Sequence, residues 1–185
     1  MPADSLAAVQ NILRAASFAA NKHAQQRRKG AAAEPYINHL IEVAQLVSNA
    51  TPVLDANLVM AALLHDVIED VGVTEEEIRQ EFGSDVANLV AEVTDDRSLP
   101  KAERKRMQVE DAPRKSVRAQ TIKLADKIAN LRGILTSPPA GWSFERKKEY
   151  FEWAKSVVAG FTAPNPLLKA EFERTYAQFG SLVRV

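Results

Sequence analysis

The sequence predicts an all-α fold, a single domain over residues 1–185 with about eight to ten helices. Apolar residues recur at spacings of three and four through most of the chain. Candidate helices begin at Ser, Thr, Asp or Asn and end at Gly or Pro, the residue types that favour helix boundaries. Strand-like alternation of apolar and polar residues is sustained nowhere. With 46% hydrophobic residues, the chain can bury a sizeable core.

The N-terminal third predicts three helices. Asp4 is a candidate N-cap for the first, which we expect to continue through the basic stretch KHAQQRRKG to Gly30. A second is expected over about 37–49, where Ile, Leu, Ala and Val share one face and a proline follows. Asp55 is placed to cap a third, apolar helix that should run to Gly72.

The middle of the chain predicts short helices with clear boundaries. Thr74 and Glu77 have the T-x-x-E spacing of a capping box, so a helix should start there. Gly83 ends it and Ser84 starts the next one. The segment LPKAERKRMQVEDAP, at 99–113, is so highly charged that we expect an exposed helix.

Three more helices are expected toward the C-terminus. A long one over 116–135 places Ile and Ala residues broadly on one side, and another is expected over 143–160. Asn165 followed by Pro166 is an N-cap with proline at the first helical position, and this helix should reach about Phe179.

Composition excludes several classes of protein. Twenty-four basic residues balance twenty-four acidic ones, so no global charge indicates a nucleic-acid or membrane-surface partner. The absence of cysteine excludes disulfides, thiolate metal sites and a Cys nucleophile. No apolar run approaches the roughly 20 residues of a membrane span, and the N-terminus is a poor signal peptide. We expect a cytoplasmic location, whereas the oligomeric state is unknown from sequence.

The stretch AALLHDVIED, at 61–70, ends an apolar run with four ionisable side chains, His65, Asp66, Glu69 and Asp70. Helical residues four apart differ by about 40° and adjacent ones by about 100°, so these side chains can border one cavity. Acids at a helix C-terminus oppose the helix dipole, at a cost of roughly 0.3–1 kcal/mol each unless a cation compensates. A metal or catalytic role and a merely solvated helix end remain alternatives on this stretch alone.

Two more residues strengthen the metal hypothesis. His39 lies near the start of an apolar helix, and Asp126 lies inside a long helix among apolar neighbours. With the His–Asp pair above, they make two neutral imidazoles and two carboxylates, a set of charge −2 that suits Mn, Fe or Zn. Each also has a structural alternative, since His39 could be a hydrogen-bonding residue and Asp126 could pair with Lys123 or Lys127.

The pattern H…HD…D resembles that of the HD superfamily of metal-dependent phosphohydrolases. The segments RRKGAAAEPYINHLIEVA, AALLHDVIED and TIKLADKIANLR look like the hydrolase domain of RelA/SpoT-type alarmone enzymes. LPKAERKRMQVEDAP and GWSFERKKEYFEWAKSVV are similar to the small, stand-alone, metazoan-type members. The resemblance covers about residues 6–161, and too little chain follows for a synthetase domain to be expected.

The resemblance implies roles for eleven residues. One Mn²⁺ would be bound by His39, His65, Asp66 and Asp126. Glu69 and Asp70 would position and activate the attacking water. Substrate would be contacted by Arg28, Lys29, Asn130, Arg146 and Tyr150. The loop 30–33 lacks the family's usual turn residues, and we assign His23 no role.

The implied reaction is hydrolysis of guanosine tetra- or pentaphosphate (ppGpp or pppGpp) at the 3′ position, giving pyrophosphate and GDP or GTP. Because the net charge is zero, local basic residues must offset the anionic substrate. The candidates are Arg27, Arg28, Lys29, Lys123, Lys127 and Arg132. The alternatives are removal of the 2′-phosphate of NADPH, hydrolysis of another nucleotide by HD chemistry, and a regulatory module that binds nucleotide without turnover.

Overall fold

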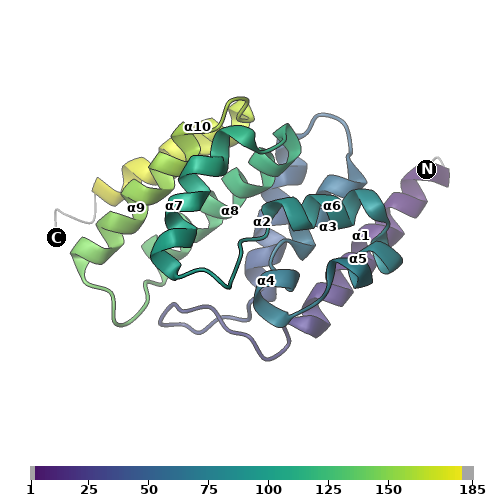
Figure 1. Ribbon diagram of the computed structural model, residues 1–185, viewed down its shortest axis with the longest axis horizontal. Coiled ribbons are helices and arrows are strands. Elements are labelled where there is room, and N and C mark those ends of the chain that lie inside the picture. The colour runs from purple at the N-terminus through teal and green to yellow at the C-terminus, as the bar shows by residue number, and fades with distance from the viewer. Residues whose placement is uncertain (1–2, 181–185) are drawn as a thin grey trace.

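Helices form the whole architecture, as predicted (Figure 1). The computed structural model describes residues 3–180, and no β-strand lies within that range apart from isolated backbone bridges. The elements in chain order are α1 (Ala3–Lys22), α2 (Ile37–Ala50), α3 (Ala56–Leu64), α4 (Val67–Val71), α5 (Glu75–Phe82), α6 (Ser84–Val93), α7 (Lys101–Asp111), the 3₁₀ turn η1 (Ala112–Arg114), α8 (Val117–Thr136), α9 (Phe144–Ala159) and α10 (Pro166–Ala177).

The predicted caps of α3, α5 and α10 are confirmed, whereas the side chain of Asp4, the predicted cap of the first helix, lies outside the described residues. Asp55 accepts a hydrogen bond from the Leu58 backbone N–H at 2.9 Å and so caps α3. Thr74 and Glu77 form the reciprocal capping box at the start of α5. Asn165 caps α10, with proline at the first helical position. These boundaries follow from local sequence, because each cap bonds its own first turn.

The first helix is shorter than predicted. It ends at Lys22, whereas the sequence indicated Gly30. Residues 23–36 instead form a loop whose two sides bond to each other. The Arg28 N–H donates to the Glu34 carbonyl at 2.8 Å, and the Tyr36 N–H donates to the Gln26 carbonyl at 3.1 Å. Backbone N–H and carbonyl groups of the loop thus form hydrogen bonds with each other although the segment is not helical.

The predicted third helix is broken at its functional end. His65 and Asp66 lie in a turn between α3 and α4, so the simple angular argument for one continuous helix was wrong there. The turn is followed by α4, in which the Asp70 N–H donates to the Asp66 carbonyl at 2.8 Å. Gly72, at φ 72°, ends α4 in the left-handed region where a Cβ would be strained.

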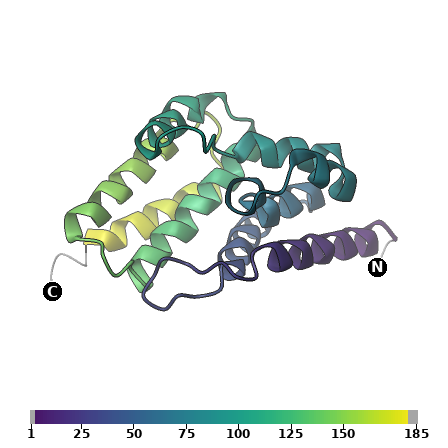
Figure 2. The same cartoon turned by 60° about the horizontal axis from the view of Figure 1, so that its bottom comes forward.

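A single cluster of buried apolar residues extends from α1 to the end of α10. Every residue of α3 from Leu58 to Leu64 is buried, because α1, α2 and α6 pack around that helix. Burial of each Leu or Val of this kind contributes about 1.5–3 kcal/mol. The long helix α8 packs against α2, α6 and α10, and α7 lies against α9 with no buried residue of its own (Figures 1 and 2).

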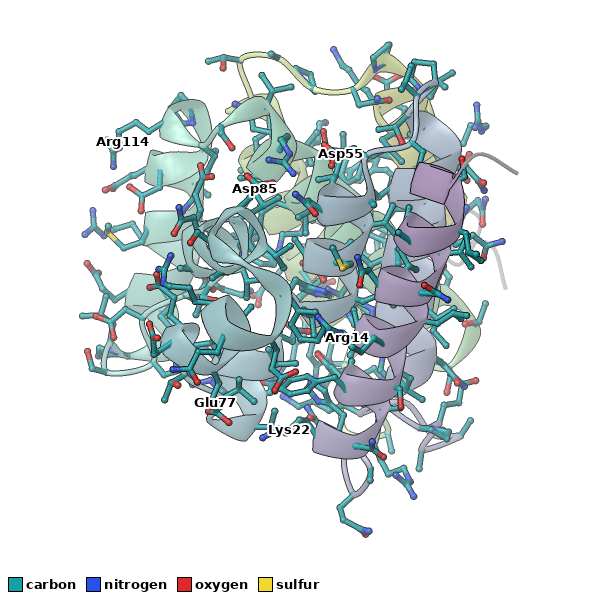
Figure 3. The ribbon with its side chains drawn as sticks, turned by 90° about the vertical axis from the view of Figure 1, so that its right-hand side faces the viewer. Arg14, Lys22, Asp55, Glu77, Asp85 and Arg114 are labelled. Carbon is teal, nitrogen blue, oxygen red and sulfur yellow. The ribbon has the colours of Figure 1, made fainter. Side chains whose placement is uncertain are left out.

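Ion pairs tie the helices together at the surface seen in Figure 3. Lys22, at the end of α1, lies 3.3 Å from Glu77 of α5. Arg118 of α8 bonds Asp85 of α6 at 2.8 Å and Asp55 at 3.1 Å. Exposed pairs of this kind contribute little, about 0–1 kcal/mol each.

None of the helices within residues 3–180 has the length and apolar character needed to cross a membrane.

Candidate active site

Four side chains from three parts of the fold converge, and we call them the His–Asp cluster: His39, His65, Asp66 and Asp126. Nε2 of His39 (α2) lies 3.3 Å from Asp126 Oδ1 (α8) and 3.8 Å from Asp66 Oδ2. Nε2 of His65 lies 3.1 Å from Asp66 Oδ2 and 3.8 Å from Asp126 Oδ1. Both carboxylates therefore face both imidazoles across a gap of a few ångströms.

The His–Asp cluster fits a divalent ion. His39, His65 and Asp126 each offer one ligand atom, and these atoms lie within 4.8 Å of one another. For metal–ligand bonds of about 2.1 Å, neighbouring ligand atoms are roughly 3.0–3.5 Å apart, which matches the shorter contacts. His65 Nδ1 donates to the Ala62 carbonyl at 2.8 Å, so its Nε2 faces the carboxylates. Nε2 of both histidines is buried without a hydrogen-bond partner among the described residues, as expected of atoms that bind a metal.

The cluster's charges influence one another strongly. Burial lowers the pKa of His39, which favours the neutral imidazole that a metal needs. Burial also acts to lower the pKa of His65, but Asp66 and Asp126 outweigh it and raise that pKa to about 10. The pKa of Asp126 is held well below its usual range against the effect of burial, chiefly by the Lys127 ammonium. Burial acts to raise the pKa of Asp66, but His65 outweighs it and lowers that pKa, so both carboxylates remain ionised.

Neighbouring residues hold the two carboxylates in place. The Tyr36 hydroxyl donates to Asp66 Oδ2 at 2.6 Å, and burial beside that carboxylate raises the tyrosine pKa, so the hydroxyl keeps its proton. Asn130 donates to Asp126 Oδ1 at 2.6 Å, and buried Lys127 donates to Oδ2 of the same residue at 3.0 Å. The carboxylates are oriented before any ligand arrives.

Glu69 and Asp70, which we call the acidic pair, lie on α4 beside the His–Asp cluster. Burial, followed by the nearby Asp95 carboxylate, raises the pKa of Glu69. Arg97, in the loop after α6, forms ion pairs with both acids, at 3.4 Å to Glu69 Oε1 and closely to Asp70 Oδ1. The Gln26 amide donates to Asp70 Oδ2 at 2.7 Å. Arg97 thus supplies the nearby cation that compensates the two acidic charges of the pair.

The basic pair Arg28 and Lys29 reaches the same cleft. Arg28 donates to Asn130 Oδ1 at 3.0 Å, so Asn130 bridges the arginine and Asp126. The loop is fixed because it lies directly on the end of α8: a Cβ on Gly30 would fall 2.3 Å from the Ser137 carbonyl oxygen. The loop lacks the usual turn residues, and its close packing on the end of α8 fixes its conformation instead.

Aromatic and basic side chains line another part of the cleft, and we call them the aromatic–basic cluster: Lys105, Trp142, Arg146, Tyr150 and Trp153. The Arg146 guanidinium lies 4.7 Å from the Trp142 ring centroid, and Lys105 Nζ lies 4.6 Å from that of Trp153. Trp142 and Tyr150 have ring centroids 5.6 Å apart. The cluster offers flat rings beside positive charges.

All these residues surround one cleft of about 1030 Å³. Ten of the eleven predicted site residues line it, and His39 lies buried behind its surface. Among the basic candidates, Arg132 does not line the cleft: it pairs with Glu42 at 3.1 Å and with Glu171. The sequence made it a candidate because an anionic substrate needs local cations, but its partners lie on α2 and α10.

Several residues in the cleft were not singled out from the sequence. Tyr36 belongs to the quoted PYINH stretch, and its position just before the helix of His39 was an available signal. Trp142, Lys105 and Trp153 lie in segments that the resemblance covered, although none had been assigned a role. Arg97 and Gln26 carried no local signal, since each acts on α4 from a distant part of the chain.

Comparison with known proteins agrees with this geometry. A family model described as HD domain matches residues 15–150. The chain is 49% identical over 172 residues to the guanosine-3′,5′-bis(diphosphate) 3′-pyrophosphohydrolase MESH1 of Xenopus tropicalis, covering 93% of this chain and 96% of the relative. It is 48% identical to the human protein of the same name over 169 residues, covering 91% and 94%.

Solved structures show the same likeness. A structure described as a metazoan ortholog of SpoT that hydrolyses ppGpp superposes with a TM-score of 0.88 and 45% identity, covering 92% of this chain and 96% of that one. A protein from Listeria monocytogenes superposes with a TM-score of 0.65 and 27% identity, covering 77% and 99%.

Proposed function

Because the chain belongs to the HD-domain family, we propose that it hydrolyses guanosine 3′,5′-bis(diphosphate) to GDP and pyrophosphate, and the pentaphosphate to GTP and pyrophosphate. The single observation that carries this proposal is the His–Asp cluster lying beside the acidic pair in one cleft. The HD domain implies a divalent metal, and we propose that it is one Mn²⁺ held by His39, His65, Asp66 and Asp126. When bound, such an ion neutralises charge on the attacked phosphate and acidifies a bound water.

The basic residues of the cleft would bind the substrate's two diphosphates. Ten lysines and arginines line it against eight aspartates and glutamates, so it has a small excess of positive charge although the chain's net charge is zero. Phosphoryl transfer depends mainly on positioning and on charge stabilisation. Arg28 and Lys29 lie on the loop beside Asn130, close to the His–Asp cluster, and we assign them to the 3′ diphosphate.

The aromatic–basic cluster would bind the guanine base. Stacking on an aromatic ring contributes about 1–3 kcal/mol per base. Trp142 and Tyr150 lie at the cleft with Arg146 beside them, so a base could stack while its phosphates meet cations. We therefore assign Tyr150 and Arg146 to substrate binding, as the resemblance implied, and add Trp142.

The acidic pair would orient the attacking water and take its proton. Water oxygen bonds to the phosphorus of the 3′ diphosphate while the bond from that phosphorus to the ribose 3′ oxygen breaks. One proton leaves the water for a carboxylate oxygen of Glu69 or Asp70, and the ribose oxygen takes one proton from solvent as it leaves. The carboxylate then returns its proton to solvent, which balances the reaction. The raised pKa of Glu69 suits a group that must accept a proton near neutral pH.

The test is a product assay on the purified chain. With Mn²⁺ and guanosine tetraphosphate, we expect equal amounts of pyrophosphate and GDP, none after metal removal with EDTA, and recovery when Mn²⁺ is restored. If nucleotide binds but no pyrophosphate appears at any metal concentration, the chain is a binding module and the proposal is wrong.

NADPH is the decisive competing substrate, because removal of its 2′-phosphate releases orthophosphate instead of pyrophosphate. We expect a higher kcat/KM for guanosine tetraphosphate, since the many cations of the cleft match a substrate with two diphosphates. A higher value for NADPH would assign the same site to a phosphatase. The cytoplasmic location stays a prediction of the sequence.

A further inference from the structure

His23 was left without a role, yet it is almost completely buried next to the acidic pair, with 2% of its surface exposed. Its ring stacks on Tyr36, with centroids 5.1 Å apart and planes 19° apart. Its Nδ1 lies 2.5 Å from Gln26 Oε1. The other end of the Gln26 amide donates to Asp70 Oδ2 at 2.7 Å. His23 is therefore connected to a candidate catalytic carboxylate through one intervening side chain.

The chemistry of these groups fixes the direction of both hydrogen bonds. A carboxylate only accepts, so the Gln26 NH₂ must point to Asp70 and its carbonyl oxygen must point to His23. His23 must then carry a proton on Nδ1, because the carbonyl oxygen cannot donate. If the amide turned over, its oxygen would face the carboxylate and repel it. The Nδ1–H of His23 thus stabilises the one orientation of the amide in which Gln26 can hold Asp70.

The backbone holds this arrangement rigidly. The Gln26 N–H donates to the His23 carbonyl at 2.9 Å, and the Tyr36 N–H donates to the Gln26 carbonyl at 3.1 Å. Tyr36 in turn bonds Asp66. The loop that follows α1 therefore contacts one carboxylate of the His–Asp cluster and one acid of the acidic pair.

Among the described residues, Asp70 has one other side-chain partner, Arg97, on its second oxygen. The Arg97 side chain is 53% exposed, so solvent screens that contact. A polyphosphate substrate also competes for an arginine at the cleft. The amide of Gln26 is uncharged and does not attract phosphate in the same way, so it can keep Asp70 in place while substrate is bound.

We propose that His23 and Gln26 are positioning residues that together hold Asp70 for its role with the attacking water. This inference rests on the proposed function of the acidic pair. It predicts an effect on kcat with little effect on KM, because the pair acts on the group that handles the water and not on substrate binding.

The test uses the full-length chain with Mn²⁺ and guanosine tetraphosphate. Gln26→Leu removes the donor to Asp70, and His23→Phe keeps a ring against Tyr36 but removes the Nδ1 donor. We expect each variant to lower kcat roughly 5- to 20-fold with KM within about twofold. The matched control is Gln25→Leu, the same change at the exposed neighbouring glutamine, which should keep wild-type kcat.

The double variant distinguishes positioning from general structural damage. If His23 acts through Gln26, His23→Phe with Gln26→Leu should be no slower than Gln26→Leu alone, because the second change removes nothing further. Multiplied losses would show that His23 acts independently and would overturn the proposed coupling. Thermal midpoints are measured beside the kinetics, since a merely structural role lowers the midpoint and leaves kcat at 25 °C unchanged.

Two failures are distinguishable. If wild-type protein releases no pyrophosphate, the proposed function fails. If wild-type protein is active and Gln26→Leu retains its full kcat, the function stands and this inference is wrong. Gln26→Leu decides the second point even if His23→Phe does not fold, because Gln26 is only partly buried.

Discussion

The His–Asp cluster and the aromatic–basic cluster line one cleft but are held in different ways. Carboxylates of the first receive hydrogen bonds from Tyr36, Asn130 and Lys127, and its imidazoles are buried. In the second, the side chains of Trp142 and Arg146 make ring and cation–π contacts at partly or fully exposed positions. We propose that the preorganised part of the site serves reaction and that the more open part serves recognition. Changes in the first should therefore affect kcat, and changes in the second should affect KM.

The largest effect is expected at the His–Asp cluster itself. Asp126→Asn removes one carboxylate charge and leaves buried Lys127 without its partner, so we expect roughly a 10³-fold or greater loss of kcat and weaker Mn²⁺ binding. Steady-state kinetics measures the loss of kcat, and calorimetric titration measures the weaker binding of Mn²⁺. Asp85→Asn is the control, because that aspartate pairs with Arg118 on α8 instead. If Asp126→Asn kept wild-type activity, the His–Asp cluster would have no part in catalysis.

The next effect separates the acidic pair from the His–Asp cluster. Glu69→Gln removes a proton acceptor but no member of that cluster, so kcat should fall about 10²–10⁴-fold while Mn²⁺ affinity stays near that of wild type. Steady-state kinetics with a metal titration on the same sample gives both values. Lost metal binding would mean that Glu69 helps to hold the ion, and the division of roles would need revision.

The pH dependence of metal binding sharpens the comparison further. Without metal, His65 has a pKa raised to about 10, so it carries a proton at pH 7, whereas the lowered pKa of His39 leaves that ring neutral. An ion must displace the one proton, so binding should release about one proton and tighten about tenfold per pH unit between pH 7 and 9. Calorimetry in buffers of different ionisation enthalpy counts the protons. No proton release would contradict the charge assignment at His65.

The smallest effect is expected in the aromatic–basic cluster. Trp142→Leu removes a flat ring and keeps an apolar side chain, so KM should rise about 5- to 30-fold while kcat changes less than threefold. The control is Phe144→Leu, because that exposed ring stacks on Phe179 and does not line the cleft. A fall in kcat that exceeds the rise in KM would break the proposed contrast between the two clusters.

The sequence predicted local features well and distant pairings poorly. Thr74 and Asn165 were identified as caps because each bonds its own first turn. The end of α1 was missed because the backbone of Arg28 bonds Glu34 across a loop. The sequence did not predict the break between α3 and α4. His65 and Asp66, which form this break, have helix-like backbone angles, and no Pro or Gly marks it.

The candidate site follows the same division. His39, His65, Asp66 and Asp126 were found because their types and spacing match a known motif, and the fold brings them together. The residues that orient them depend on long-range contacts. Arg97 reaches α4 from the loop after α6, and Arg132 turns away from the cleft to Glu42. Such contacts depend on how helices pack, which no local pattern encodes.

The most direct test of this account is to locate the metal by anomalous diffraction from crystals grown with Mn²⁺. The account predicts one strong peak in contact with His39, His65, Asp66 and Asp126 together. A peak elsewhere, or an ion that leaves either histidine out of contact, would contradict it.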